Sequence, residues 1–81
     1  METLDVVREA VGVVLEIDPA TLDADTTFAA LKADSLVLVG VADEVEARVG
    51  TASGLHIDDG TLAGVTTLGQ LAEYVTRQVG R

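Results

Sequence analysis

One serine of the chain, Ser35, has a sequence context that suits covalent modification. Ser35 has an acid directly before it and a leucine directly after it, and the chain changes there from a polar stretch to the apolar run 36–42. A helix is therefore predicted to begin at this point, with Asp34 as its N-cap. Because the first turn of a helix has unpaired N–H groups and partial positive charge, it suits a phosphorylated hydroxyl. We predict that Ser35 is exposed in this turn and is a covalent attachment point.

The other candidate groups do not combine into a catalytic site. A serine nucleophile needs a base within hydrogen-bond reach and a group that orients the base. The chain has one histidine, His56, which we expect to pack on the core with its apolar neighbours. The acidic pairs 43–44 and 58–59 lack the alternating ligands of a calcium loop, and without cysteine a zinc site is not expected. We therefore expect neither enzyme activity nor a metal.

The charge of the chain limits its partners. Fourteen acidic and five basic side chains give 81 residues a formal net charge of -9. Nucleic acids and anionic membranes attract basic proteins, so neither partner is expected. An acidic surface attracts partners with basic patches, although the same acidity could serve solubility alone. The N-terminus lacks the basic and apolar blocks of a signal peptide, so we expect a cytoplasmic location. We also expect the protein to be a monomer.

Helical periodicity accounts for most of the sequence. The length and the hydrophobic fraction of 48% predict a single folded domain, 1–81, with an almost wholly aliphatic core. Apolar residues at helical spacing predict helices over 3–16, 35–49 and 67–79. A fourth, short helical turn is predicted within 58–65. Thr67 and Gln70 match a capping box, and Gly50 is a predicted C-cap. The fold class is therefore all-α, a small helical bundle.

The segment before the second helix and the faces of that helix are less regular. Residues 17–34 are predicted to form a long loop, and loops of that length are often functional. The residues of the second helix that can supply its buried face are Leu36, Val39, Val41, Val45 and Val49. Val37 and Leu38 are left outside this face, so they either form an exposed partner site or pack on the loop.

Several short segments follow one another along the chain in a recognisable order. They are the first helix, Ile17-Asp18-Pro19, Thr26-Thr27-Phe28 with Leu31, Asp34-Ser35-Leu36, and Thr66-Thr67-Leu68. In order and spacing they resemble the acyl carrier protein family over nearly the whole chain. The resemblance implies that Ser35 receives 4'-phosphopantetheine from coenzyme A through a separate phosphopantetheinyl transferase. It also implies that the thiol of this arm carries acyl groups as thioesters between enzymes.

The resemblance further implies that the second helix is the partner surface. Its partners would be acyl-loading, condensing or modifying enzymes with basic or apolar docking patches. The residues expected to meet them are Asp34, Leu36, Val37, Asp43, Glu44 and Glu46.

The sequence departs from the family pattern in three places. Lys32 stands where the family usually has glycine. If this position needs a left-handed backbone, lysine costs about 1 kcal/mol; otherwise the loop closes differently. Val37 and Gly40 replace acids that are common in fatty-acid carriers, which makes docking near Ser35 more apolar. The segment 50–57 is a few residues longer than in compact members.

These departures favour a specialised, stand-alone carrier, for example in polyketide biosynthesis, over the housekeeping carrier of fatty acid biosynthesis. Two alternatives stay open. One is a peptidyl or aminoacyl carrier of a nonribosomal-peptide-type pathway, although Asp34 and the acidic balance favour the acyl type. The other is an unmodified, carrier-like interaction protein that docks through its second helix.

Overall fold

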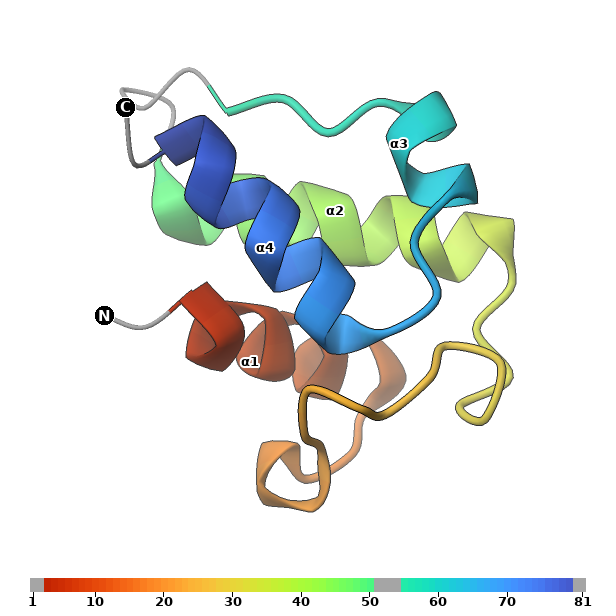
Figure 1. Ribbon diagram of the computed structural model, residues 1–81. Coiled ribbons are helices and arrows are strands. Elements are labelled where there is room, and N and C mark those ends of the chain that lie inside the picture. Colours follow the sequence, from red (N-terminus) through yellow and green to blue (C-terminus); the bar gives the residue numbers. More distant parts are fainter. Residues whose placement is uncertain (1–2, 51–54, 80–81) are drawn as a thin grey trace.

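A computed structural model describes residues 3–50 and 55–79 of the chain (Figure 1). The helices are α1 (Thr3–Leu15), α2 (Ser35–Val49), α3 (Asp59–Ala63) and α4 (Leu68–Val79), with a short 3-10 helix, η1 (Pro19–Thr21). The described residues contain no strand, only an isolated antiparallel bridge between Thr27 and Thr67. The predicted all-α class, with three main helices and one short one, is confirmed. Residues 51–54 of the longer connection lie outside the described residues.

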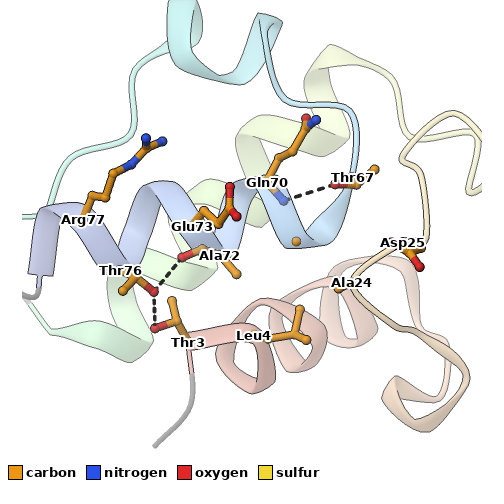
Figure 2. A pocket seen from close by; sticks show the side chains of 11 residues that line it. Thr3, Leu4, Ala24, Asp25, Thr67, Gln70, Ala72, Glu73, Thr76 and Arg77 are labelled. Carbon is orange, nitrogen blue, oxygen red and sulfur yellow. Dashed lines mark hydrogen bonds between the residues drawn. The ribbon is translucent and has the colours of Figure 1, made fainter.

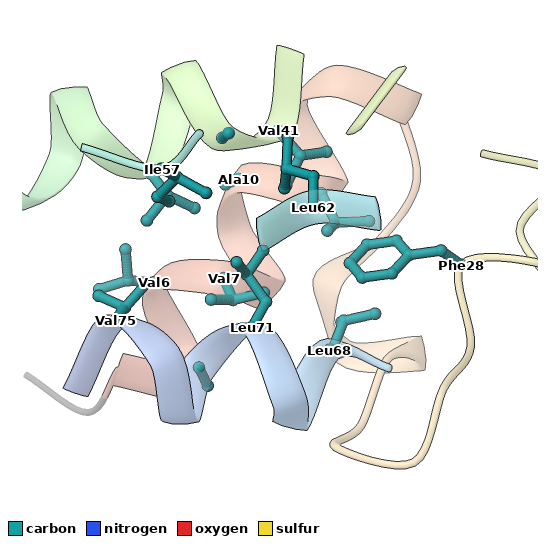
Figure 3. Close-up of a cluster of buried hydrophobic side chains, with 14 of the residues drawn as sticks. Val6, Val7, Ala10, Phe28, Val41, Ile57, Leu62, Leu68, Leu71 and Val75 are labelled. Carbon is teal, nitrogen blue, oxygen red and sulfur yellow. The ribbon is translucent and has the colours of Figure 1, made fainter. Parts of the chain in front are cut away.

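The core lies where α1, α2 and α4 meet (Figure 3). Its buried side chains are aliphatic apart from one phenylalanine: Val6, Val7, Ala10, Val11, Leu22, Phe28, Val41, Ala42, Val45, Ile57, Leu62, Leu68, Leu71, Ala72 and Val75. No polar or charged side chain is buried among the residues that the structure describes. Polar groups able to do chemistry therefore lie on the surface of the bundle.

The first helix ends against the chain that follows it. Glu16 has a left-handed backbone, with φ of 58°, and the N–H of Ile17 donates to the carbonyl of Gly12 at 3.0 Å, which is a Schellman end. Pro19 then folds back on α1, so closely that a Cβ on Gly12 would lie 2.8 Å from its Cγ. Arg8 donates from Nη2 to the carbonyl of Pro19 at 3.1 Å. The helix consequently ends one residue before the predicted boundary.

The segment 17–34, predicted as a long loop, is held by backbone hydrogen bonds to the start of α4. The N–H of Phe28 donates to the carbonyl of Thr66 at 3.0 Å, and the N–H of Leu68 donates to the carbonyl of Thr26 at 3.1 Å. No local sequence pattern predicts either hydrogen bond, because each bond joins segments that are far apart in the sequence. The loop is thereby fixed to the bundle by main-chain as well as apolar contacts.

Close contact between this loop and α4 depends on a glycine. The N–H of Gly69 donates to the carbonyl of Ala24 at 2.9 Å, and a Cβ built on Gly69 would lie 2.9 Å from that same oxygen. Only a residue without a Cβ allows the two backbones to approach this closely.

The predicted caps of the last two helices are present, one of them in altered form. Asp58 Oδ1 accepts the N–H of Thr61 at 2.7 Å at the start of α3. Thr67 Oγ1 accepts the N–H of Gln70 at 3.1 Å at the start of α4. In the predicted capping box, the side chain of Gln70 would accept the N–H of Thr67. Its Oε1 instead accepts the N–H of Thr66, at 2.7 Å. The cap therefore includes one more residue of the incoming chain.

Candidate functional site

Ser35 is the first residue of α2 and its side chain is exposed. Asp34 has an extended backbone, and its Oδ1 accepts the N–H of Val37 at 2.9 Å. The carbonyl of Asp34 accepts the N–H of Leu38 at 3.0 Å. The helix therefore begins as predicted, with Asp34 as its N-cap. The hydroxyl of Ser35 has no hydrogen-bond partner within the described part of the chain, so it is available to another molecule.

The turn that leads into α2 is closed by a lysine in the left-handed region. Lys32 has φ of 57°. Its N–H donates to the carbonyl of Ala29, and the N–H of Ala33 donates to the carbonyl of Phe28, each at 3.0 Å. This pair of bonds has the Schellman pattern. Of the two alternatives for this position, the structure adopts the left-handed one, with a cost of about 1–2 kcal/mol for a residue that has a Cβ.

A cavity of about 310 Å³ lies beside the serine, between the start of α2 and α3. The residues that line it are Ser35, Leu36, Leu38, Val39, Asp59, Leu62 and Ala63. Apart from Ser35 and Asp59, all of them are apolar. The sequence patterns did not indicate that α3 lies beside Ser35. The available signal was the adjacent pair Leu62-Ala63, an apolar face in an otherwise polar turn.

The predicted buried face of α2 is partly wrong. Val41 and Val45 are buried, but the side chain of Leu36 is 80% exposed and that of Val39 is 37% exposed. The first two turns of α2 are apolar on nearly every side, so periodicity alone could not show which side faces the core. Val37 and Leu38 are half-buried and pack against the core, and Leu38 also lines the cavity.

The acidic residues of α2 have different environments. Asp43 is exposed. Glu44 Oε1 forms an ion pair with Nε of Arg48 at 3.2 Å, and Glu46 Oε2 accepts the N–H of Ile57 at 3.0 Å. Glu44 and Glu46 thus have roles within the protein, whereas Asp43 is the more available of the three carboxylates.

The expectation that His56 packs on the core is wrong. Its side chain is 79% exposed, with Nδ1 4.0 Å from Oε2 of Glu46, while Ile57 takes the buried position. Its carbonyl accepts the hydroxyl of Tyr74 at 3.3 Å. Within the described residues no hydrogen bond joins His56 to Ser35, and no group of three acidic or histidine side chains is placed to hold a metal ion.

A larger hollow, of about 1000 Å³, lies between the start of α1, residues 24–25 and α4 (Figure 2). Thr76 Oγ1 donates to the carbonyl of Ala72 at 2.9 Å at this place, and the hydroxyls of Thr76 and Thr3 lie 2.8 Å apart. Ser35 is not among the residues that line the hollow. Within residues 3–50 and 55–79, no helix has the length and apolar character needed to cross a bilayer.

The family comparison accounts for this arrangement. The model of the family described as phosphopantetheine attachment site matches residues 5–75, from the first turn of α1 to the third turn of α4. None of the curated proteins that were compared matches the chain. An exposed hydroxyl without a partner, at a helix start and beside an apolar cavity, is suited to carry a covalent group. The chain belongs to the phosphopantetheine attachment family, that of the acyl carrier proteins, which carry covalently bound 4'-phosphopantetheine.

Proposed function

We propose that 4'-phosphopantetheine is attached to Ser35 and that the chain carries acyl intermediates on this arm. The observation that supports the proposal most is the position of the Ser35 hydroxyl, exposed at the first residue of α2 and without a partner among the described residues. The chain contains one other serine, Ser53. A transferase could approach the Ser35 hydroxyl without unfolding any part of the bundle.

The residues around Ser35 suit the base of such an arm. Asp34 caps α2 through the N–H of Val37, which fixes the backbone of the serine at the helix start. The partial positive charge of this first turn favours the phosphodiester that esterification would create, while the negative charges of Asp34 and Asp59 oppose it. When bound, the arm supplies a terminal thiol that holds an acyl group as a thioester. The five apolar residues that line the cavity beside Ser35 suit the hydrocarbon part of an acyl group.

We further propose that this chain is not an enzyme and that its partners perform the chemistry. The distance between Nδ1 of His56 and Glu46 is 4.0 Å, and neither residue is hydrogen-bonded to Ser35. A serine without a base to activate it is a poor nucleophile. The partner must therefore supply the group that removes the proton of the Ser35 hydroxyl.

The partner surface that we propose is the exposed side of α2, with Asp34, Leu36, Val37, Asp43, Glu44 and Glu46. Leu36 and Asp43 are its main contacts, because both are exposed and lie seven residues apart, on one side of the helix. Val37, Glu44 and Glu46 contribute less, since each is partly occupied within the protein. A partner would then have an apolar patch near Ser35 and a cationic patch about 12 Å further along α2, at 1.5 Å per residue.

Intact-mass measurement tests the attachment site. Apo protein is incubated with coenzyme A and a broad-specificity phosphopantetheinyl transferase, together with the variants Ser35→Ala and Ser53→Ala. We expect the wild type and Ser53→Ala to gain one phosphopantetheine and Ser35→Ala to gain none. No gain in the wild type, or a gain that persists in Ser35→Ala, would exclude the proposal and favour an unmodified interaction protein.

We propose a role in polyketide or other specialised biosynthesis. The proposal is supported by the uncharged first two turns of α2, where Val37 and Gly40 stand in place of acids. Mass spectrometry of protein purified from its native host, with the thioester intact, would identify the cargo. A β-keto or otherwise functionalised acyl group is expected. A long saturated chain would instead indicate fatty acid synthesis, and an aminoacyl group a peptidyl carrier.

A further inference from the structure

Lys32 is the only lysine of the chain, and its side chain is exposed in the turn before α2. Within the described residues, its ammonium group has no hydrogen-bond or ion-pair partner. By contrast, Arg8 pairs with Asp5 and Arg48 pairs with Glu44. In a chain with fourteen acids and five bases, a cation left without an acid needs an explanation.

Stability does not explain the lysine. With φ of 57°, the backbone of Lys32 lies in a region that glycine adopts freely and that a Cβ makes unfavourable. The exposed side chain adds no burial that could offset this cost. A role for the side chain outside the free, unmodified protein would account for its presence.

The surroundings of Ser35 indicate that role. The carboxylate of Asp34 already occupies the positive end of α2, and a second acid, Asp59, is among the residues that line the same cavity as Ser35. A phosphodiester on Ser35 would add a further negative charge, which these two acids disfavour. No lysine or arginine lines the cavity, so the cation on the approach to the helix is Lys32.

The side chain can reach the phosphodiester. Three peptide units separate residues 32 and 35, so their Cα atoms lie at most about 11 Å apart. The flexible four-carbon stem of lysine on one side, and the serine oxygen with its phosphorus on the other, can span this distance. We propose that Lys32 binds the phosphodiester of the arm through a charge-assisted hydrogen bond, and so positions the base of the arm beside the turn at 28–33. This inference rests on the proposed attachment at Ser35.

The test compares apo and modified forms of the wild type, Lys32→Gln, Lys32→Arg and Arg48→Gln. Arg48→Gln removes the same charge at a place about 20 Å along α2 from Ser35, at 1.5 Å per residue. The ³¹P chemical shift of the phosphodiester reports its local contact. In protein labelled with ¹³C-lysine, the single ε-CH₂ resonance reports the same contact from the side of Lys32. Unfolding equilibria of both forms at low and high salt complete the thermodynamic cycle.

We expect modification to shift the lysine resonance in the wild type. The ³¹P shift should change in Lys32→Gln, remain near the wild-type value in Lys32→Arg, and be unaffected in Arg48→Gln. At low salt, the ratio of unfolding constants between the modified and apo forms should differ about two- to fivefold between the wild type and Lys32→Gln, as for an exposed ion pair. High salt should remove this difference.

Two kinds of failure can be told apart. If the wild type gains no phosphopantetheine, or Ser35→Ala still gains it, the attachment proposal itself is wrong. If Ser35 is modified but the ³¹P shift and the unfolding ratio are the same in the wild type and in Lys32→Gln, the attachment stands and the role of Lys32 is refuted.

Discussion

The same substitution at two helical glycines should have opposite effects on stability. Gly69 lies in the first turn of α4, where an added Cβ would be 2.9 Å from the carbonyl oxygen of Ala24 and 3.1 Å from its Cβ. Gly40 lies in the interior of α2, where an added Cβ would meet only Cγ1 of Val14, at 3.6 Å. The first contact is a clash with backbone, whereas the second is an ordinary van der Waals contact.

The magnitudes follow from these contacts. In Gly69→Ala, the loop must move away from α4, which costs about 1–3 kcal/mol for overpacking and about 1 kcal/mol for the lost bond to Ala24. The helix propensity of alanine returns less than 1 kcal/mol, so we expect a net loss of about 2 kcal/mol. In Gly40→Ala, only the helix propensity of the residue changes, and we expect the free energy of unfolding to rise by about 1 kcal/mol.

Urea unfolding followed by circular dichroism gives the free energy of unfolding and its slope for both variants. In thermal unfolding, Gly69→Ala should lower the midpoint by about 10 °C and Gly40→Ala should raise it by about 5 °C. A double variant with Ala24→Gly should recover little, because the carbonyl oxygen remains. A Gly69→Ala protein as stable as the wild type would refute the view that the loop rests on α4 through this contact.

Three further outcomes are expected. Gly12→Ala should lower the free energy of unfolding by about 1–3 kcal/mol in urea titrations, because the new Cβ would lie 2.8 Å from Cγ of Pro19; unchanged stability would contradict the close packing at the end of α1. Lys32→Gly should stabilise the apo protein by about 0.5–1 kcal/mol in the same assay, since relief of the left-handed strain exceeds the added entropy of the unfolded chain; a loss would mean that the lysine supports the turn. Hydrogen bonds from the backbone N–H of Thr61, and secondarily from its hydroxyl, lower the pKa of Asp58 in the folded protein. The Asp58 carboxylate therefore stabilises the fold above its unfolded pKa of about 3.9. This stabilisation is lost as the pH falls through the lower folded pKa. Asp58→Asn should flatten this part of the stability profile below about pH 4, and an unchanged profile would rule out the contribution of Asp58.

Local signals predicted the helices of this chain well. The bounds of α2 are those predicted, because Asp34 is a strong N-cap and Gly50, with φ of 98°, ends the helix. The short helix α3 was found from its capping aspartate and its two glycines. The position of Ser35 follows from the cap of α2, so the placement of this serine was predictable from a few adjacent residues, whereas the cavity that α3 forms beside it was not.

Features that depend on distant parts of the chain were not predictable in this way. The loop 17–34 is fixed through main-chain bonds such as that from Phe28 to Thr66, and main-chain bonds do not depend on residue type. The orientation of α2 was also missed. Leu36 is apolar but largely exposed, and Val39 is partly exposed, because the place of a helix in the bundle is set by its neighbours as well as by its own pattern. For Lys32, the sequence suggested a left-handed backbone as one of two alternatives but could not show which of them the structure adopts.

The bridge between Thr27 and Thr67 has a consequence for the newly made protein. Residues 24–28 can form their bonds to the start of α4 only when that helix is present. The N–H groups of Leu68 and Gly69 donate to the carbonyls of Thr26 and Ala24, and the N–H of Phe28 donates to the carbonyl of Thr66. During synthesis the start of α4 leaves the ribosome well after the serine does, so in a nascent chain the hydroxyl emerges before residues 24–28 are fixed to the bundle. A transferase that contacts residues 24–28 in their ordered form would therefore act on finished chains and leave growing ones unmodified.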